Sequence, residues 1–405
     1  MTIPIFRTHR PAEILSKPWI AAVSLLVIAS VPVPASARDN DHDRDDDDSR
    51  ALIFSTVGDS RQDPVAPDSS TLPLYGQDSI WLQNTKALTR IMRGIHDQKS
   101  QFLFFNGDMI MGYGNAALPP KTGTISDILN SDLVQFYKQY AFWRGIAADF
   151  MEGGTYVVPV PGNHEVQWKA GGKKAVAVNE DAWRANMGDL IFDNRRLGNL
   201  FGDTAANPAV GDNRNALDGL KTDQSKLSFS FDYRGSHFVV INTDPTGADS
   251  HAPAHWLDAD LDAAQGRGLK RFFVFGHKPA FTYWYGSVIP ALPALPLPGK
   301  ASGLDVDIPA RDAFWDVIEK YGAIYFCGHE HIYNVSQPRG KAWQIMVGSG
   351  GSPFEAGPSA ATVSPTDRYY AWATVAVHRE NVVIQTFGFN AAYGPTHILN
   401  TIVVH

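Results

Sequence analysis

YVVPVPGNHE occupies residues 156–165 and joins a short apolar run to a turn that carries an amide, an imidazole and a carboxylate. An apolar run of about four to eight residues bounded by glycine and proline is typical of a buried strand. Gly162 permits a sharp change of backbone direction, so Asn163, His164 and Glu165 leave the end of the strand together. The stretch therefore predicts a buried strand whose carboxyl end presents polar side chains.

The same order of apolar run, turn and polar side chain recurs along the chain. Further runs rich in Ile, Val and Phe lie at 52–57, 102–105, 238–241, 272–275 and 324–326. The turns that follow four of these runs are Gly58-Asp59-Ser60-Arg61, Asn106-Gly107-Asp108, Gly276-His277-Lys278-Pro279 and Gly328-His329-Glu330-His331. We therefore expect the polar side chains at the carboxyl ends of strands.

Apolar residues at helical spacing occupy 80–96, 133–150 and 254–264, between the predicted strands. Strands that alternate with helices indicate an α/β fold, in which ligands bind in the crevice outside the carboxyl ends of the strands. The segments 369–377, 382–389 and 396–404 have instead the pattern of an antiparallel meander. From this meander we expect a second sheet.

Composition places the chain among globular proteins and limits its partners. It has 405 residues, of which 44% are hydrophobic and 19% charged, enough to bury a large core as one domain over residues 51–405. The net charge of -7 and the lack of a Lys/Arg-rich block give no electrostatic footprint for nucleic acid. Any bound phosphate is therefore expected on a small molecule, and the oligomeric state is unknown from sequence.

The N-terminus predicts export. Basic residues precede an apolar run at 19–31, and Ala35-Ser36-Ala37 has the small-x-small form that signal peptidase accepts. The apolar run is shorter than the roughly 20 residues that span a bilayer, which argues against a membrane anchor. Residues 1–37 are therefore interpreted as a signal peptide, and the mature protein as periplasmic or secreted, without a membrane span.

Residues 38–50 are strongly acidic and predict a disordered, solvated leader. The domain after it has a single cysteine, Cys327, so no internal disulfide can form. A chain of this size has core enough to fold without one.

The side chains in the turns are of the kinds that bind metal. Carboxylate oxygens, amide oxygens and imidazoles are ligands that divalent transition metals take from proteins. Two ions bridged by one carboxylate can hold a phosphate, acidify a water molecule and stabilise both the entering and the leaving oxygen. The residue types therefore favour a dinuclear metal site that hydrolyses phosphoesters.

In their order along the chain, these turns resemble the signature of the calcineurin-like metallophosphoesterases, nearest the purple-acid-phosphatase-related branch. That signature is D-x-H, G-D, G-N-H-D/E, a lone G-H and then G-H-x-H, and the matching residues span most of the mature chain. The resemblance implies a four-layer α/β/β/α sandwich of two mixed sheets flanked by helices, with the metal site at the carboxyl ends of strands. It also implies two divalent or trivalent transition-metal ions (Mn, Fe or Zn) and a small phosphomonoester or phosphodiester substrate.

The resemblance also implies a role for each matching residue. Asp108 would bridge the two ions. His164 would act as general acid on the leaving oxygen while metal-activated water attacks, and Glu165 would orient the ring of His164. The other ligands would be Asp59 and His331 on one side and Asn163, His277 and His329 on the other.

Two positions depart from the signature. The histidine expected two residues after Asp59 is Arg61, and the tyrosine that the purple-acid-phosphatase branch has three residues after Asp108 is Met111, with Tyr113 nearby at a different spacing. A guanidinium stays protonated and does not bind metal, although its donors suit phosphate. Arg61 therefore either contacts the substrate or points away, and the Asp59-side metal position lacks a ligand.

These departures leave two hypotheses. The first is an active enzyme whose substrate contacts Arg61 and Asn163. The second is a phosphate- or metal-binding module in which an incomplete first metal site has weakened or abolished turnover. A serine hydrolase is not indicated, because no G-x-S-x-G elbow follows a predicted strand.

Overall fold

The computed structural model describes residues 51–61, 85–191, 216–282, 301–354 and 368–405. All of these lie in the unit Ala51–His405. The signal peptide and acidic leader predicted before residue 51 lie outside the described residues, so both stay predictions. In the described ranges no helix has the length and apolar character needed to cross a bilayer.

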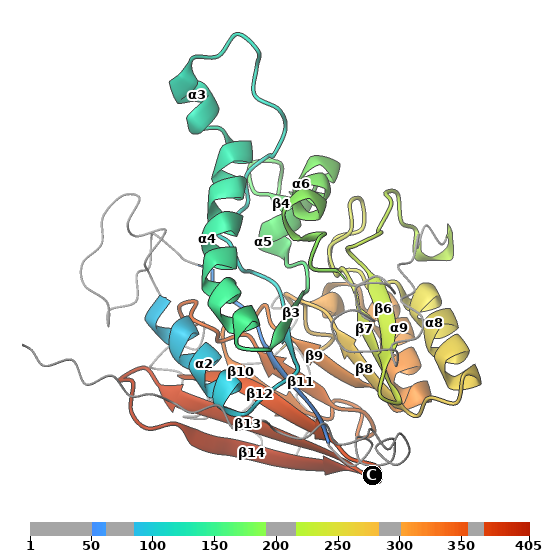
Figure 1. Cartoon of the computed structure of the whole chain (residues 1–405). Helices are drawn as coiled ribbons and strands as arrows, with labels where there is room; N and C mark the ends of the chain where they lie inside the picture. The colour runs from blue at the N-terminus through green and yellow to red at the C-terminus, as the bar shows by residue number, and fades with distance from the viewer. Residues whose placement is uncertain (1–50, 62–84, 192–215, 283–300, 355–367) are drawn as a thin grey trace, which may run out of the picture. The chain divides into compact units, whose positions relative to one another are not determined.

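The first of two six-stranded sheets holds the strands of the opening motifs (Figure 1). Its members are β1 (Leu52–Val57), β2 (Phe102–Phe105), β3 (Tyr156–Pro159), β12 (Tyr369–Val377), β13 (Val382–Asn390) and β14 (His397–Val404). β1, β2 and β3 are parallel neighbours, so the turns that follow them emerge at one edge of the sheet. β12, β13 and β14 continue from the other side of β1 as antiparallel strands.

The second sheet is also mixed. Its members are β6 (Phe229–Tyr233), β7 (Ser236–Val240), β8 (Arg271–Phe275), β9 (Ile324–Cys327), β10 (Tyr333–Ser336) and β11 (Gln344–Val347). β7, β8, β9 and β11 are parallel, whereas β6 and β10 pair antiparallel at the two edges. The motif turns after β8 and β9 therefore also leave together.

The expectation that the C-terminal meander forms a second sheet is wrong. Its strands are antiparallel as predicted, but they extend the first sheet, with Val377 of β12 opposite Leu52 of β1. β1 has β2 on one side only, and without β12 its other edge would carry unpaired N–H and C=O groups. The second sheet comes from β6–β11 instead.

Helices cover the outer face of each sheet, which confirms the predicted four-layer arrangement (Figure 1). α2 (Thr85–Asp97) and α4 (Asp132–Glu152) pack on the first sheet, and α8 (Ala254–Gly266) and α9 (Ile308–Tyr321) pack on the second. α9 shows why such a segment is helical: the carboxylate of Asp307 accepts the N–H of Ala310 at its start. Gly322, in the left-handed conformation that favours glycine, ends it.

The shorter elements lie between these layers and the loops. They are α3 (Ile125–Leu129), α5 (Asn163–Val166), α6 (Ala177–Met187), the 3-10 turns η2 (Ala216–Asp218) and η3 (Leu304–Val306), and the two-stranded hairpin β4 (Gln167–Trp168) and β5 (Lys174–Ala175). α5 begins with Asn163, so the amide and imidazole of the opening motif sit in its first turn.

Aromatic side chains fill the space between the two sheets. Phe54 of β1 is fully buried, and its ring centre lies 4.9–5.6 Å from those of Phe104, Phe238 and Phe273. Edge-to-face aromatic pairs contribute about 0.5–1.5 kcal/mol each beyond the burial of their area. This packing fixes one sheet against the other and thereby the relative position of the turns.

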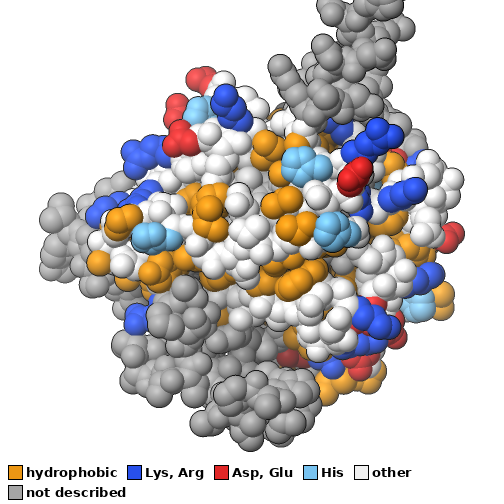
Figure 2. Space-filling model, turned by 90° about the horizontal axis from the view of Figure 1, so that it is seen from below, with side chains coloured by type: hydrophobic (Ala, Val, Ile, Leu, Met, Phe, Trp, Pro, Cys, Tyr) orange, Lys and Arg blue, Asp and Glu red, His pale blue; other side chains and the backbone are white. Residues whose placement is uncertain are grey.

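The surface carries no comparable concentration of apolar side chains on the face shown in Figure 2, where hydrophobic, polar and charged groups are interspersed. β14, the lowest strand in Figure 1, exposes Ile398 and Val403 on the free edge of the first sheet. Scattered apolar side chains of this kind are ordinary on protein surfaces.

Candidate functional site

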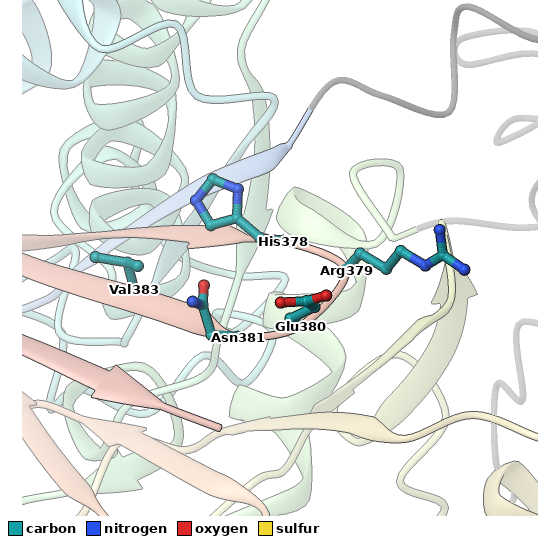
Figure 3. A pocket seen from close by; sticks show the side chains of 5 residues that line it. All are labelled: His378, Arg379, Glu380, Asn381 and Val383. Atoms are coloured by element: carbon teal, nitrogen blue, oxygen red, sulfur yellow. The ribbon is translucent and has the colours of Figure 1, made fainter.

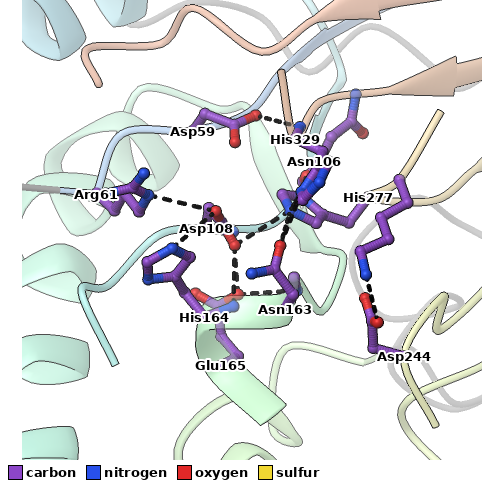
Figure 4. Close-up of polar contacts among 12 residues, drawn as sticks. Asp59, Arg61, Asn106, Asp108, Asn163, His164, Glu165, Asp244, His277 and His329 are labelled. Atoms are coloured by element: carbon purple, nitrogen blue, oxygen red, sulfur yellow. Dashed lines mark hydrogen bonds and ion pairs between the residues drawn. The ribbon is translucent and has the colours of Figure 1, made fainter. Parts of the chain in front are cut away.

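The motif turns of the two sheets meet at the carboxyl ends of the parallel strands (Figure 4). Backbone hydrogen bonds join them: the N–H of Asp59 donates to the carbonyl of Gly107 (3.0 Å), and that of Gly58 donates to Val347 of the second sheet (2.9 Å). Asp59, Asp108 and His329 all have φ between 53° and 72°. Side chains other than glycine rarely adopt that conformation, and strain of this kind tends to gather at functional sites.

His277 shows which of its ring nitrogens faces the centre of the site. The ring is fully buried, and Nδ1 lies 2.7 Å from the carbonyl oxygen of Asn106. Because a carbonyl only accepts, Nδ1 donates a proton to Asn106, and Nε2 is the ring nitrogen that faces the site. Nε2 lies 2.8 Å from Oδ1 of Asn163 and 3.2 Å from Oδ1 of Asp108.

Asn163 is oriented by a neighbour on its other side. Its Nδ2 donates to the hydroxyl oxygen of Tyr113 at 2.5 Å, which turns Oδ1 toward the histidines. Nδ1 of His329 lies 2.8 Å from that Oδ1 and 3.2 Å from Nε2 of His277. Burial and the neighbouring His277 hold the pKa of His329 well below its ordinary value, so the ring is neutral.

Asn163, His277 and His329, which we call the Asn163 half, thus turn one amide oxygen and two ring nitrogens toward one point, together with Oδ1 of Asp108. Oxygen atoms and imidazole nitrogens are the ligands that borderline divalent metals take from proteins. These residues fit a bound transition-metal ion.

Asp59, Arg61 and His331 form the opposite side, which we call the Asp59 half. Oδ2 of the buried Asp59 accepts the backbone N–H of His329 at 2.9 Å, and Nε2 of His331 lies 3.7 Å from Oδ1 of Asp59. Nδ1 of His331 donates to the carbonyl of Pro353 (2.7 Å). Burial, reinforced by the charge of Arg61, lowers the pKa of His331 to about 3. His331 is therefore neutral at pH 7.

Arg61 points into the site. Its Nε lies 3.5 Å from Oδ2 of Asp108, and its Nη1 lies 3.8 Å from the sulfur of Met111. The side chain is 12% exposed. The sequence left open whether Arg61 faces the site or turns away, and the geometry selects the first. One oxygen of Asp108 thus faces His277 and the other faces a guanidinium.

Buried Asp59, Asp108 and His277 can each offer a ligand atom, and these atoms lie within 4.8 Å of one another. Asp108 lies between the two halves, with Oδ1 near His277 and Oδ2 near Arg61. The two halves therefore share one carboxylate but present different groups to it.

His164 lies beside Asp108 with its ring nearly enclosed. Its Nδ1 donates to the carbonyl of Met111 (2.5 Å), and its Nε2 lies 3.7 Å from Oδ2 of Asp108. Burial, together with the charge of Arg61, holds the pKa of His164 well below its ordinary value. Nε2 is the nitrogen left to exchange a proton with a ligand.

Glu165 does not orient the ring of His164, contrary to the expectation from sequence. Its carboxylate accepts four backbone N–H groups, from Asp108, Met109, Ile110 and Gly162, at 2.8–3.2 Å. The reason is topological: α5 turns Glu165 back under the neighbouring turn, where those amides have no strand partner. Burial and the nearby Asp108 raise the pKa of Glu165, whereas the backbone N–H donors lower it and favour the carboxylate. Glu165 therefore ties the turn after β2 to the turn after β3.

Lys278 and Asp244 form a buried ion pair next to the turn that carries His277. Nζ of Lys278 lies 2.7 Å from both Oδ1 of Asp244 and the hydroxyl of Ser250, and all three residues are buried. This pair fixes the turn that carries His277 against the loop after β7.

A cavity of about 330 Å³ opens above these residues. It contains most of the predicted site, and its walls include Tyr113, Lys169 and Lys173, which the sequence did not assign to a site. Tyr113 packs on the ring of His164 with the ring centres 3.7 Å apart, and burial raises its pKa. The one sequence feature that indicates a turn at these lysines is the Gly171-Gly172 pair between them.

A second hollow, of about 470 Å³, lies at the turn between β12 and β13 (Figure 3). Its walls come from that turn alone, His378 to Asn381 and Val383, and mostly exposed side chains form them. No buried or convergent polar group marks it among the described residues, so the cavity above Asp108 is the candidate site.

Comparison with known proteins identifies the fold. No family model and no curated protein matches the chain. A purple acid phosphatase isolated from yellow lupin (Lupinus luteus) seeds superposes with a TM-score of 0.52 and 13% identity, over 88% of this chain and 54% of that one. This chain therefore spans about half the length of the plant phosphatase.

Two further solved structures are more distant. A dimetal phosphatase from Danio rerio has a TM-score of 0.46 and 12% identity over 87% of this chain and all of its own. A 5'-nucleotidase from Candida albicans has a TM-score of 0.34 and 14% identity over 85% and 53%. The likeness to the plant enzyme confirms the calcineurin-like fold that the motifs implied.

Proposed function

We propose that the protein is a metal-dependent phosphoester hydrolase. The observation that carries the proposal is the Asn163 half, where Oδ1 of Asn163 and Oδ1 of Asp108 both lie within 3.2 Å of Nε2 of His277. Such a set of oxygen and imidazole groups fits a transition-metal ion, and it lies at the base of a cavity of about 330 Å³, large enough for a small phosphoester.

The residues that would hold the ion are Asp108, Asn163, His277 and His329. A divalent transition metal such as Mn, Fe or Zn supplies Lewis acidity to the phosphoryl oxygen and lowers the pKa of water. The carbonyl of Asn106 and the hydroxyl of Tyr113 keep His277 and Asn163 turned toward that point.

Arg61 takes the part of the second cation in this proposal. Its guanidinium pairs with Oδ2 of Asp108, and unit charges of like sign ~4 Å apart repel by about 4 kcal/mol at an effective dielectric of ~20. A further ion beside Asp59 and His331 is therefore disfavoured. The guanidinium donors instead orient the phosphate oxygens and balance the charge that develops on them in the transition state.

His164 is the general acid of the proposed reaction. The bond from Nδ1 to the carbonyl of Met111 leaves Nε2 facing the cavity. A phosphoester dianion beside Nε2 favours the protonated ring, which then donates the Nε2 proton to the leaving oxygen. Tyr113 holds the ring in place from one side.

The proposal covers phosphomonoester and phosphodiester substrates alike. Export through the predicted signal peptide would place the enzyme in the periplasm or outside the cell.

The test combines elemental analysis with rates on paired aryl phosphomonoester and phosphodiester substrates under several added metals. Metal-replete protein is expected to bind transition metal and to cleave at least one class. His164→Ala is expected to lose roughly 10²- to 10⁴-fold in kcat while it keeps the metal.

The rival hypothesis is the binding module without turnover. It predicts metal and phosphate binding by the wild-type protein, no cleavage of any substrate in the panel, and no difference between wild type and His164→Ala. That outcome would refute the proposal that the protein is an enzyme.

A further inference from the structure

The β4–β5 hairpin brings two lysines to the cavity of the candidate site. Residues 169–173 connect the two strands, and Lys169 and Lys173 line the same cavity as Asp108 and His164. Asp108 and His164 are buried, whereas both lysines are exposed. The lysines therefore lie at the outer end of the cavity and Asp108 at its inner end.

The connection is held in a defined conformation. The N–H of Lys169 donates to the carbonyl of Tyr113 (3.0 Å), and that of Lys173 donates to the carbonyl of Trp168 (3.1 Å). A Cβ on Gly171 would lie 2.4 Å from the ring of Trp168, so glycine is required for that close approach. Hydrogen bonds thus attach the hairpin to the loop that carries Tyr113.

Lys173 occupies a backbone position that favours glycine. Its φ is 56°, directly after Gly171 and Gly172. A long side chain in the left-handed region costs roughly 1 kcal/mol relative to glycine, and residues kept there often serve a ligand. The ammonium group of Lys173 is the feature that glycine would not supply.

Lys174, the next residue, provides the contrast. Its Nζ lies 3.5 Å from Oδ2 of Asp249, and it does not line the cavity. Within the described ranges no carboxylate lies within 4.0 Å of the ammonium groups of Lys169 and Lys173. Two positive charges at the outer end of the cavity are therefore available to a ligand.

We propose that Lys169 and Lys173 bind a second phosphate group of the substrate. This inference rests on the proposed function and names its substrate class: a small molecule in which the group leaving the scissile phosphorus carries another phosphate. The scissile phosphate lies at Asp108 and Arg61, and the leaving group extends outward past His164 to the hairpin.

The reaction balances as a hydrolysis. Water forms a new P–O bond at the phosphorus beside Asp108, and the bond from that phosphorus to the leaving oxygen breaks. His164 gives its proton to that oxygen, and the attacking water supplies a proton in return. The second phosphate departs with the leaving group, unchanged, from Lys169 and Lys173.

The experiment compares two substrates, inorganic pyrophosphate and p-nitrophenyl phosphate, which differ in the second phosphate. Lys169→Ala/Lys173→Ala is expected to lose about tenfold in kcat/KM for pyrophosphate, as two exposed charge contacts imply, and less than about twofold for the aryl phosphate. Lys174→Ala/Lys341→Ala removes the same charge from exposed lysines that do not line the cavity and is the matched control.

Equal losses on the two substrates, no loss on either, or the same loss in the control would overturn the proposal. If wild-type protein cleaves neither substrate, the proposed function fails, and calorimetry of pyrophosphate binding to the metal-loaded protein decides the role of the lysines. The double variant should then bind pyrophosphate about tenfold more weakly than wild type and the control. Unchanged affinity would exclude the subsite, and thermal unfolding of each variant verifies its folding.

Discussion

The two halves of the candidate site are built from the same kind of turn but direct different groups at Asp108. The Asn163 half presents an amide oxygen and ring nitrogens, since Asn163 and His277 are fixed by Tyr113 and by the carbonyl of Asn106. The Asp59 half presents a guanidinium, 3.5 Å from the other oxygen of Asp108. Under the proposed function, Arg61 leaves one metal position and one fixed organic cation where the motifs imply two metal positions.

The largest expected effect separates the halves directly. His329→Ala removes a donor from the Asn163 half and should weaken metal binding by more than the ~10- to 100-fold that loss of a partner outside the ligand set costs. His331→Ala should retain the ion, because its ring faces Asp59 rather than the cluster around His277. Metal content after dialysis measures both. Equal loss of metal in the two variants would remove the distinction between the halves.

Removal of the guanidinium should affect turnover more than metal binding. Arg61→Ala is expected to lower kcat by roughly 10²- to 10³-fold, as loss of one oriented donor to the transition state does in other enzymes. Its metal affinity should remain, since Arg61 contacts Oδ2 of Asp108 and the cluster uses Oδ1. Arg61→Lys, which keeps the charge but not the planar donors, should recover only part of the rate. Full activity of Arg61→Ala would show that the guanidinium has no catalytic part.

Glu165 fixes the turn that carries Asp108, the carboxylate that faces both halves, so its removal should lower stability rather than discriminate between them. Glu165→Gln would set an amide NH₂ against backbone N–H groups that now donate to a carboxylate, and each donor left unsatisfied costs about 1–3 kcal/mol. We expect the free energy of unfolding in urea to fall by about 2–3 kcal/mol. Glu380→Gln, at an exposed turn, is the control and should change nothing. A stable Glu165→Gln variant would contradict the bracing role.

The smallest effect concerns the Asn163 half alone. Tyr113→Phe keeps the ring that packs on His164 but loses the oxygen that accepts from Asn163. One hydrogen bond contributes about 1 kcal/mol, so metal affinity should fall about fivefold with a small change in stability. Titration of the metal-free protein with Mn²⁺ or Zn²⁺ measures it. A loss as large as that of His329→Ala would instead make Tyr113 a ligand.

The sequence predicted which side chains lie together where spacing within one turn decides their position. Gly162, Asn163 and His164 are adjacent in the chain, so their common position at the end of β3 follows from a single strand and a single turn. The order of five such turns was then enough to indicate the fold, because parallel strands bring their carboxyl ends to one edge.

The sequence could not predict contacts that depend on how separate loops pack. Arg61 is directed inward by Met111 and Asp108, which come from another turn. Tyr113 enters the site because Gly112, at φ 47°, passes so close to the carbonyl of His164 that a Cβ would lie 1.8 Å from it. The spacing of residues along the chain does not predict this close contact between Gly112 and His164.

The prediction that the C-terminal meander forms a second sheet failed for a similar reason. Alternation identified the antiparallel strands 369–377, 382–389 and 396–404, but the choice of sheet depended on the open edge of β1, more than 300 positions earlier. The sheet that a strand joins is a property of the assembled core and not of the strand's own pattern.

The most direct test of the difference between the halves is the number of metal ions per chain. Elemental analysis of purified, metal-replete protein should find one ion per chain in the wild type, held by the Asn163 half. Arg61→His, which replaces the guanidinium by a neutral ligand beside Asp59, should bind two. Two ions per chain in the wild type, with no increase in Arg61→His, would contradict the conclusion that Arg61 stands in for the second ion.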